Sequence, residues 1–113
     1  MSKRNWKLLF EDIMECIQKI EKYTEGLEFE DFKTREIVID AVVRNLEIIG
    51  EVSRNVPEEV KKRFKDVPWK SIVGLRNRVI HGYFGVDLSI IWHIIRHELP
   101  DLKNKIEGAS KHE

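Results

Sequence analysis

Apolar residues recur at steps of three and four along the first part of the chain. They are Trp6, Leu9, Ile13, Cys16, Ile17 and Ile20. This spacing puts them on one side of a helix, so it predicts an amphipathic helix that buries that side. We expect the helix to end near Tyr23, because Gly26 suits a left-handed cap. Residues 27–33, LEFEDFK, predict a turn that carries Phe29 and Phe32 into the core.

A second helix is predicted from about Thr34 to Asn55. Its apolar stripe consists of Val38, Val42, Leu46, Ile49, Val52 and Val56. A stripe of alternating charge follows the same helix at steps of four, three and four, and consists of Asp40, Arg44, Glu47 and Glu51. Its simplest interpretation is a solvated face, on which each ion pair stabilises the helix by about a few tenths of a kcal/mol.

Two prolines divide the middle of the chain. Pro57 stands at a favoured first-turn position, and PEEVKKRF, residues 57–64, predicts a short helix. Pro68 follows a second stop, because a proline forces the residue before it into an extended conformation. From there we predict a third long helix that runs toward Ile80 and ends around Gly82 to Gly85.

Asp87 is a predicted N-cap for the last helix. The apolar stripe of this helix consists of Leu88, Ile91, Trp92, Ile95 and Leu99. Pro100 follows the stripe, and the tail after Ile106 is predicted to fray. No segment has the alternating pattern of a strand, so the sequence predicts an all-α fold: an antiparallel bundle of four main helices with one short helix between the second and third.

Length and composition restrict the kind of protein this is. A chain of 113 residues is the size of a single domain, here residues 1–113. Lysine and arginine number 20 and so do aspartate and glutamate, so any contact with nucleic acid must come from a local patch. Cys16 is the one cysteine, which excludes an internal disulfide; we expect it to be a small buried apolar residue. No apolar run approaches the roughly 20 residues that a bilayer requires, and we expect a cytoplasmic protein without membrane contact.

Residues 74–87, GLRNRVIHGYFGVD, gather most of the chemically capable side chains. Arg76 and Tyr83 are seven residues apart and share a helical face, whereas His81 lies about 140° from Arg76 around an ideal helix. One interpretation is that His81 and the arginines complement the dipole at a helix C-terminus. The other is that a long arginine, or a helix that ends at Gly82, brings these side chains to one cleft.

Metal chemistry is not favoured by the histidines. His93 and His97 form an i, i+4 pair on the last helix, but no glutamate stands between them as in the HExxH zinc motif. The sequence also contains neither a nucleophile elbow nor a phosphate-binding glycine loop. We therefore predict no metal site and no cofactor.

An arginine and a histidine suit one reaction that needs no metal. RNA carries its own nucleophile, the 2′-hydroxyl, so an enzyme needs a base, a cation for the phosphate and an acid for the leaving 5′-oxygen. Histidine serves as base or acid near neutral pH, and arginine matches phosphate oxygens with a fork of donors. One histidine and one arginine supply half of such a site, so two copies across a two-fold axis would complete it.

The stretch RNRVIHGY, residues 76–83, resembles the R-x4-H-x-Y signature of the HEPN superfamily, specifically its HepT-type toxins encoded beside minimal nucleotidyltransferase antitoxins. Further segments resemble that family in order and spacing: YTEGLEFEDF (23–32), DAVVRNLEIIGE (40–51), VPEEVKKRF (56–64), VPWKSIVGLRNRVIHGYFGVD (67–87) and IIWHIIRHELPDL (90–102). Together they cover most of the chain.

The resemblance implies a homodimer and metal-independent endoribonuclease activity of a type II or type VII-like toxin–antitoxin pair. It implies that Arg76 and His81 are catalytic, with Asn77 assisting, and that Tyr83 is adenylylated by the nucleotidyltransferase partner. Arg44 is then expected to help line the cleft, and Arg78 to be a surface or RNA-backbone contact. The alternative is a non-catalytic module that binds a nucleotide or a partner through the same residues.

Overall fold

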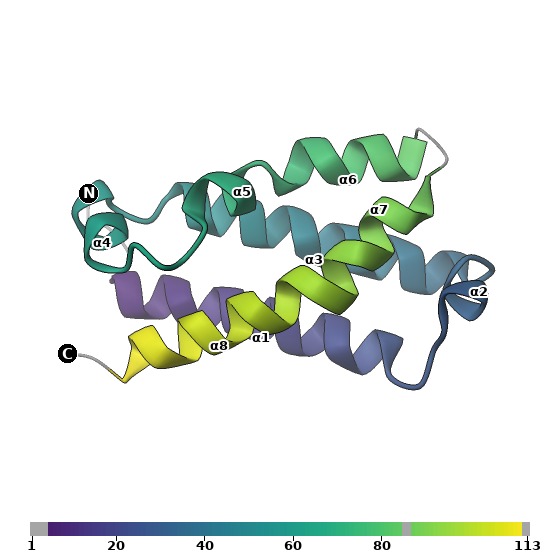
Figure 1. The fold of residues 1–113 in the computed structure, drawn as a ribbon, viewed down its shortest axis with the longest axis horizontal. Coiled ribbons are helices and arrows are strands. Elements are labelled where there is room, and N and C mark those ends of the chain that lie inside the picture. The colour runs from purple at the N-terminus through teal and green to yellow at the C-terminus, as the bar shows by residue number, and fades with distance from the viewer. Residues whose placement is uncertain (1–4, 85–86, 112–113) are drawn as a thin grey trace.

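The computed structural model describes residues 5–84 and 87–111, and within these residues it contains helices and no strand. The long helices are α1 (Trp6–Thr24), α3 (Glu36–Arg54), α6 (Leu75–Phe84) and α8 (Leu99–Ser110). The short ones are α2 (Phe29–Phe32), α4 (Glu58–Arg63), α5 (Trp69–Val73), α7 (Leu88–His93) and the π-helix η1 (Ile94–Glu98). Figure 1 shows that α1, α3 and α6 run in alternating directions and that α7, η1 and α8 form one rod across them. The predicted all-α bundle is confirmed, and none of the described helices is long and apolar enough to cross a membrane.

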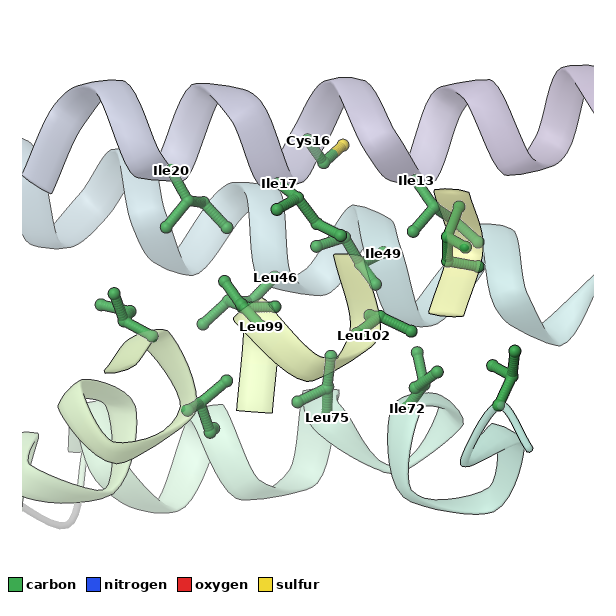
Figure 2. Packing of buried hydrophobic residues seen from close by; sticks show 14 of the residues in the cluster. Ile13, Cys16, Ile17, Ile20, Leu46, Ile49, Ile72, Leu75, Leu99 and Leu102 are labelled. Carbon is green, nitrogen blue, oxygen red and sulfur yellow. The ribbon is translucent and has the colours of Figure 1, made fainter. Parts of the chain in front are cut away.

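The core lies where α1 and α3 meet the rod formed by α7, η1 and α8 (Figure 2). Fully buried side chains come from each of these helices, among them Ile13, Ile17, Leu46, Ile49, Ile94 and Ile106. The predicted burial of Cys16 is confirmed, and burial raises the pKa of its thiol. The side of α6 and α5 that faces this core contributes Ile72, Leu75 and Val79.

The first helix begins and ends close to where the pattern predicts. Its N-cap is Asn5, whose side chain accepts a hydrogen bond of 2.8 Å from the Lys7 amide. After the helix, Gly26 has a φ of 77°, the left-handed conformation that its position suggested. The turn expected over residues 27–33 contains the one-turn helix α2. It buries Phe32 completely and Phe29 in part, and both rings pack against Trp92.

The buried face of α3 is wider than the predicted stripe. Val38 and Val52 are only half-buried, whereas Ile39 and the polar Asn45 and Ser53 are buried. The reason is that α3 packs against α1 on one side and against α5 and α6 on the other. The Asn45 side chain satisfies its buried amide by donating a hydrogen bond of 2.8 Å to the Ala41 carbonyl oxygen.

The third predicted helix was wrong in its continuity, whereas its end at Phe84 agrees with the predicted range of Gly82 to Gly85. Gly74 is the C-cap of α5 and separates it from α6, with a ψ of −1° that lies about 40° from the helical value. The helix α6 then passes through Gly82 and ends at Phe84. Gly85, the other residue expected to end it, lies outside the described residues.

The last helix was predicted correctly at its start and wrongly at its end. Asp87 is the N-cap, and its carboxylate accepts a hydrogen bond of 3.2 Å from the Ser89 amide. Pro100 does not stop the helix, and the tail expected to fray continues as helix to Ser110. A proline ring in an α-helix clashes with the carbonyl of the fourth residue before it. We attribute the tolerance of Pro100 to the wider π turn of η1 directly before it.

Candidate functional site

The helix α6 presents its chemically capable residues to solvent. Its buried side consists of Leu75, Val79 and Gly82, at the three- and four-residue steps of a single face. Arg76, Asn77 and His81 are all exposed. Because α6 is a regular helix across both residues, the angle of about 140° between Arg76 and His81 is kept. The predicted route to a shared cleft through a helix ending at Gly82 is therefore excluded.

Tyr83 makes the contact that joins α6 to α3. Its hydroxyl group donates a hydrogen bond of 2.8 Å to Oδ1 of Asp40. This hydrogen bond, followed by the negative charge of Asp40, raises the pKa of Tyr83 above its ordinary value, because both favour the neutral phenol. On its other side the Tyr83 ring meets the edge of Phe84, with 4.9 Å between ring centroids. The phenol is therefore exposed to solvent, and its orientation is fixed by Asp40 and Phe84.

A hollow of about 270 Å³ lies between α3 and α6. Its lining consists of Asp40, Val43, Arg44, Glu47, Val79, Ile80, Tyr83 and Phe84. Asp40, Arg44 and Glu47, three members of the predicted stripe of alternating charge, thus line a hollow beside α6. The stripe is therefore not only a solvated face. The structure brings Arg44 and Tyr83 to one hollow, whereas the lining does not include Arg76, Asn77 or His81.

Gly50 is a residue of this region that the sequence analysis missed. A Cβ atom on Gly50 would stand 3.3 Å from the Ile72 carbonyl oxygen and 3.9 Å from the Arg76 amide nitrogen. The glycine therefore allows α3 to lie close to the junction between α5 and α6, just before Arg76. Its signal in the sequence was a glycine inside an otherwise apolar and charged helix, where it costs about 1 kcal/mol relative to alanine.

Gly82 also has a packing role that differs from the predicted one. A Cβ atom on Gly82 would stand 3.0 Å from Cγ1 of Ile91 and 3.1 Å from the Asp87 carbonyl oxygen. The space beside this glycine is occupied by the start of α7. Gly82 sets how closely the end of α6 approaches the rod.

Arg78 points to the rod, on the side of α6 away from Tyr83. Its guanidinium binds both carboxylate oxygens of Glu98 in η1, with 2.9 Å from Nη1 to Oε1 and a shorter contact from Nη2 to Oε2. Nη1 also donates to Oγ of Ser71 in α5, at 3.3 Å. The guanidinium of Arg78 thus makes three hydrogen bonds to other side chains, two to Glu98 and one to Ser71.

The histidines of the rod are near one another but do not form a metal centre with other ligands. The rings of His93 and His97 stack with 4.8 Å between centroids, and Nε2 of His93 lies 3.8 Å from Oε2 of Glu98. Across the described part of the chain, no group of three or more histidine, cysteine, aspartate or glutamate side chains is arranged to hold a metal ion.

Large apolar side chains are exposed around the hollow. Ile37 is 85% exposed and Phe84 73%, with Ile80 and Tyr83 beside them at 37% and 38%. Ile37 lies one helical turn before Asp40, which contacts Tyr83, so these residues belong to one surface. We call these four residues the open apolar face. Large exposed apolar side chains that gather on one side of a protein are typical of a contact surface.

Fold and site together define an all-helical protein with an arginine, an asparagine and a histidine displayed on one exposed helix. The family model described as ribonuclease HepT-like matches residues 13–109, which include all the site residues named above. The chain therefore belongs to the HepT-like ribonuclease family, and the resemblance drawn from the sequence is confirmed.

Relatives match over nearly the whole chain. A protein of Thermococcus cleftensis named "Probable ribonuclease HepT" is 41% identical over 109 residues, which are 96% of this chain and 99% of the relative. A protein of Methanocaldococcus jannaschii is 39% identical over 95% of this chain and 98% of its own. The "mRNA nuclease HepT" of Shewanella oneidensis is 26% identical over 84% of this chain and 88% of its own. No solved structure matches the chain.

Proposed function

We propose that this protein is an endoribonuclease toxin that cleaves RNA without a metal ion, through Arg76 and His81. The observation that carries this proposal is that α6 displays both residues, with Asn77, on its exposed side, in a chain of the HepT-like ribonuclease family. The names of two relatives, a ribonuclease and an mRNA nuclease, support RNA as the substrate.

The proposed reaction is an internal transesterification. The 2′-oxygen attacks the neighbouring phosphorus, the bond to the 5′-oxygen breaks, and the products are a 2′,3′-cyclic phosphate and a free 5′-hydroxyl. A histidine that takes the 2′-hydroxyl proton or supplies the proton of the leaving oxygen contributes about 10²- to 10⁴-fold. His81 has this role. Arg76 binds the phosphate oxygens as charge builds on them, and Asn77 donates a further hydrogen bond.

A homodimer completes this site. Within one copy, Arg76 and His81 point in directions about 140° apart around α6, so a single phosphate does not readily meet both. Ile80 and Phe84 of the open apolar face lie on the same helix and offer a surface for a second copy. An isologous contact through α6 would bring two arginines and two histidines together and supply both a base and an acid.

Tyr83 is proposed as the control point, modified with AMP by a minimal nucleotidyltransferase antitoxin. The phenol oxygen would attack the α-phosphorus of ATP, pyrophosphate would leave, and Asp40, which already accepts the phenol hydrogen bond, would take the proton. The added phosphate charge beside the hollow repels RNA. Mass spectrometry should find one AMP on the wild type after incubation with the antitoxin and ATP, none on Tyr83→Phe and one on Tyr23→Phe.

Arg44 is proposed to bind the RNA backbone from the hollow between α3 and α6. It is exposed and stands among Asp40, Glu47 and Tyr83. As a phosphate contact outside the reacting group, it should affect RNA affinity more than the chemical step.

The proposal is tested by incubating the purified protein with RNA in the presence of a chelator and analysing the RNA ends. The wild type should leave 2′,3′-cyclic phosphates, and His81→Ala and Arg76→Ala should each lower the rate by about 10²-fold or more. His97→Ala is the matched control, because His97 is also an exposed histidine and lies on η1, outside α6 and the hollow. Intact RNA with the wild type, or cleavage by His81→Ala at the wild-type rate, contradicts the proposal. The first result would favour the nucleotide-binding or partner-binding alternative.

A further inference from the structure

Among the described residues, Arg78 differs from Arg76, the other arginine of α6, in having its charge paired with a carboxylate. Its guanidinium meets both oxygens of Glu98 in a fork, and the two side chains are about one-third exposed, at 34% and 33%. A forked pair of this kind fixes direction as well as distance, because two parallel hydrogen bonds cannot both survive a rotation of either partner.

The pair joins elements that are distant in the sequence. Arg78 lies on α6, Glu98 is the last residue of η1, and Ser71 on α5 adds a third contact to the same guanidinium at 3.3 Å. The three residues therefore bind α5, α6 and the rod to one another. Glu98 is itself placed by the π turn that precedes Pro100.

This contact acts on the orientation of α6 about its own axis. The apolar side of α6 is short, with Leu75 and Val79 as its fully apolar buried side chains. Arg78 lies two residues after Arg76 and three before His81, so a rotation that breaks the fork redirects both. We propose that Arg78 and Glu98 form a positioning pair that sets the direction of Arg76 and His81 for RNA cleavage. The inference rests on the proposed function of those two residues.

The competing role for Arg78 is a direct contact with the RNA backbone. The geometry disfavours it for two reasons. The forked carboxylate already neutralises the guanidinium, and an approaching phosphate would meet the negative charge of Glu98 at the same place. A phosphate contact would also require the fork and the Ser71 hydrogen bond to break.

Four variants separate these roles: Arg78→Ala, Glu98→Ala, the exchange of Arg78→Glu with Glu98→Arg, and the control Lys103→Ala. Lys103 forms a long-range ion pair with Glu21, at 3.1 Å, between α8 and α1. For each variant, kcat and KM are measured on RNA, and unfolding by urea gives the folded fraction. The two single variants, Arg78→Ala and Glu98→Ala, should each lower kcat at least tenfold at nearly constant KM. The charge exchange should restore part of kcat. Lys103→Ala should change neither constant.

Three outcomes would overturn the positioning role. In the first, Arg78→Ala raises KM while Glu98→Ala does not lower kcat, as an RNA contact requires. In the second, both variants lose stability but keep the wild-type kcat per folded molecule, as a merely structural pair requires. In the third, Arg78→Ala lowers kcat but Glu98→Ala does not, and the charge exchange does not restore kcat.

Hydrogen exchange provides a readout that does not depend on cleavage. In Arg78→Ala and in Glu98→Ala, the amides of α6 should exchange several-fold faster relative to those of α3, and the charge exchange should slow them again. Unchanged exchange in α6 overturns the positioning role. Absence of cleavage by the wild type contradicts the proposed function instead, so the two failures are distinguishable.

Discussion

The two sides of α6 differ in how completely the protein covers them. On the side of the rod, Gly82 allows close contact with α7, and Arg78 is forked to Glu98. On the side of α3, a hollow of about 270 Å³ remains and large apolar residues are exposed. The closed side fixes the helix, whereas the open side has the features of a surface that receives another molecule. Substitutions on the first should therefore act on stability or on the direction of Arg76 and His81, and substitutions on the second should act on association or on Tyr83.

The largest effect on stability is expected at Gly82. Gly82→Ala places a methyl group 3.1 Å from the Asp87 carbonyl oxygen, a backbone atom that cannot yield without moving α7. Overpacking of this kind costs about 1–3 kcal/mol, and the better helix propensity of alanine recovers only part of it. We expect a net loss of about 1–2 kcal/mol in the free energy of unfolding, measured by urea denaturation.

Gly108→Ala is the matched control for this substitution. Gly108 is also helical, but a Cβ atom there meets nothing within 4 Å. Alanine should stabilise the protein at this position by up to about 1 kcal/mol. If the two variants change the unfolding midpoint in the same direction, the closed side of α6 does not have the tight packing described here.

The second effect concerns association through the open apolar face. Ile37→Glu and Phe84→Glu should each convert a dimer to a monomer in light scattering after size exclusion, because each buries an unpaired carboxylate in the interface. The unfolding of the isolated chain should change little, since both positions are exposed. Leu8→Glu, at an exposed leucine of α1 away from this face, should leave the dimer intact. A wild type that is monomeric at all concentrations would contradict the prediction.

The smallest effect is confined to Tyr83. The contact with Asp40 holds the phenol in its neutral form, so Asp40→Asn should lower the pKa of Tyr83 toward the ordinary value. The sign follows from linkage: a raised pKa contributes stability below the ordinary pKa of about 10, and this is lost as the pH rises through the folded-state value. Ultraviolet titration of Tyr23→Phe, with and without Asp40→Asn, isolates the signal of Tyr83. A pKa that does not fall on removal of the carboxylate argues against the hydrogen bond.

Much of the fold was predictable because it depends on local patterns. The stripe of α1, the left-handed Gly26 and the Asp87 cap each follow from a few neighbouring residues. The site residues Arg76, Asn77, His81 and Tyr83 were recognisable because they stand in one short signature. Their roles remain predictions until cleavage is measured.

What the sequence did not reveal are contacts between distant segments. The fork between Arg78 and Glu98 spans 20 residues, and the hydrogen bond between Tyr83 and Asp40 spans 43. Periodicity describes one helix at a time and contains no information on which neighbour a polar residue meets. The helical course of Gly82 was missed for the same reason, since the tight approach of α7 explains the glycine better than a helix end does.

The π turn of η1 has a consequence for how the length of this chain can change. A π turn holds one residue more than the α-helix would, so deletion of an exposed residue such as His97 would restore α-helical spacing and keep Leu102 and Ile106 turned inward. In a regular helix such as α1, the same deletion would rotate every later residue by about 100°. After the deletion in η1, Pro100 would stand in the interior of a continuous α-helix, which costs about 3 kcal/mol. The extra residue and the proline are thus linked, and a shortened chain is expected to fold well only if the proline is replaced at the same time.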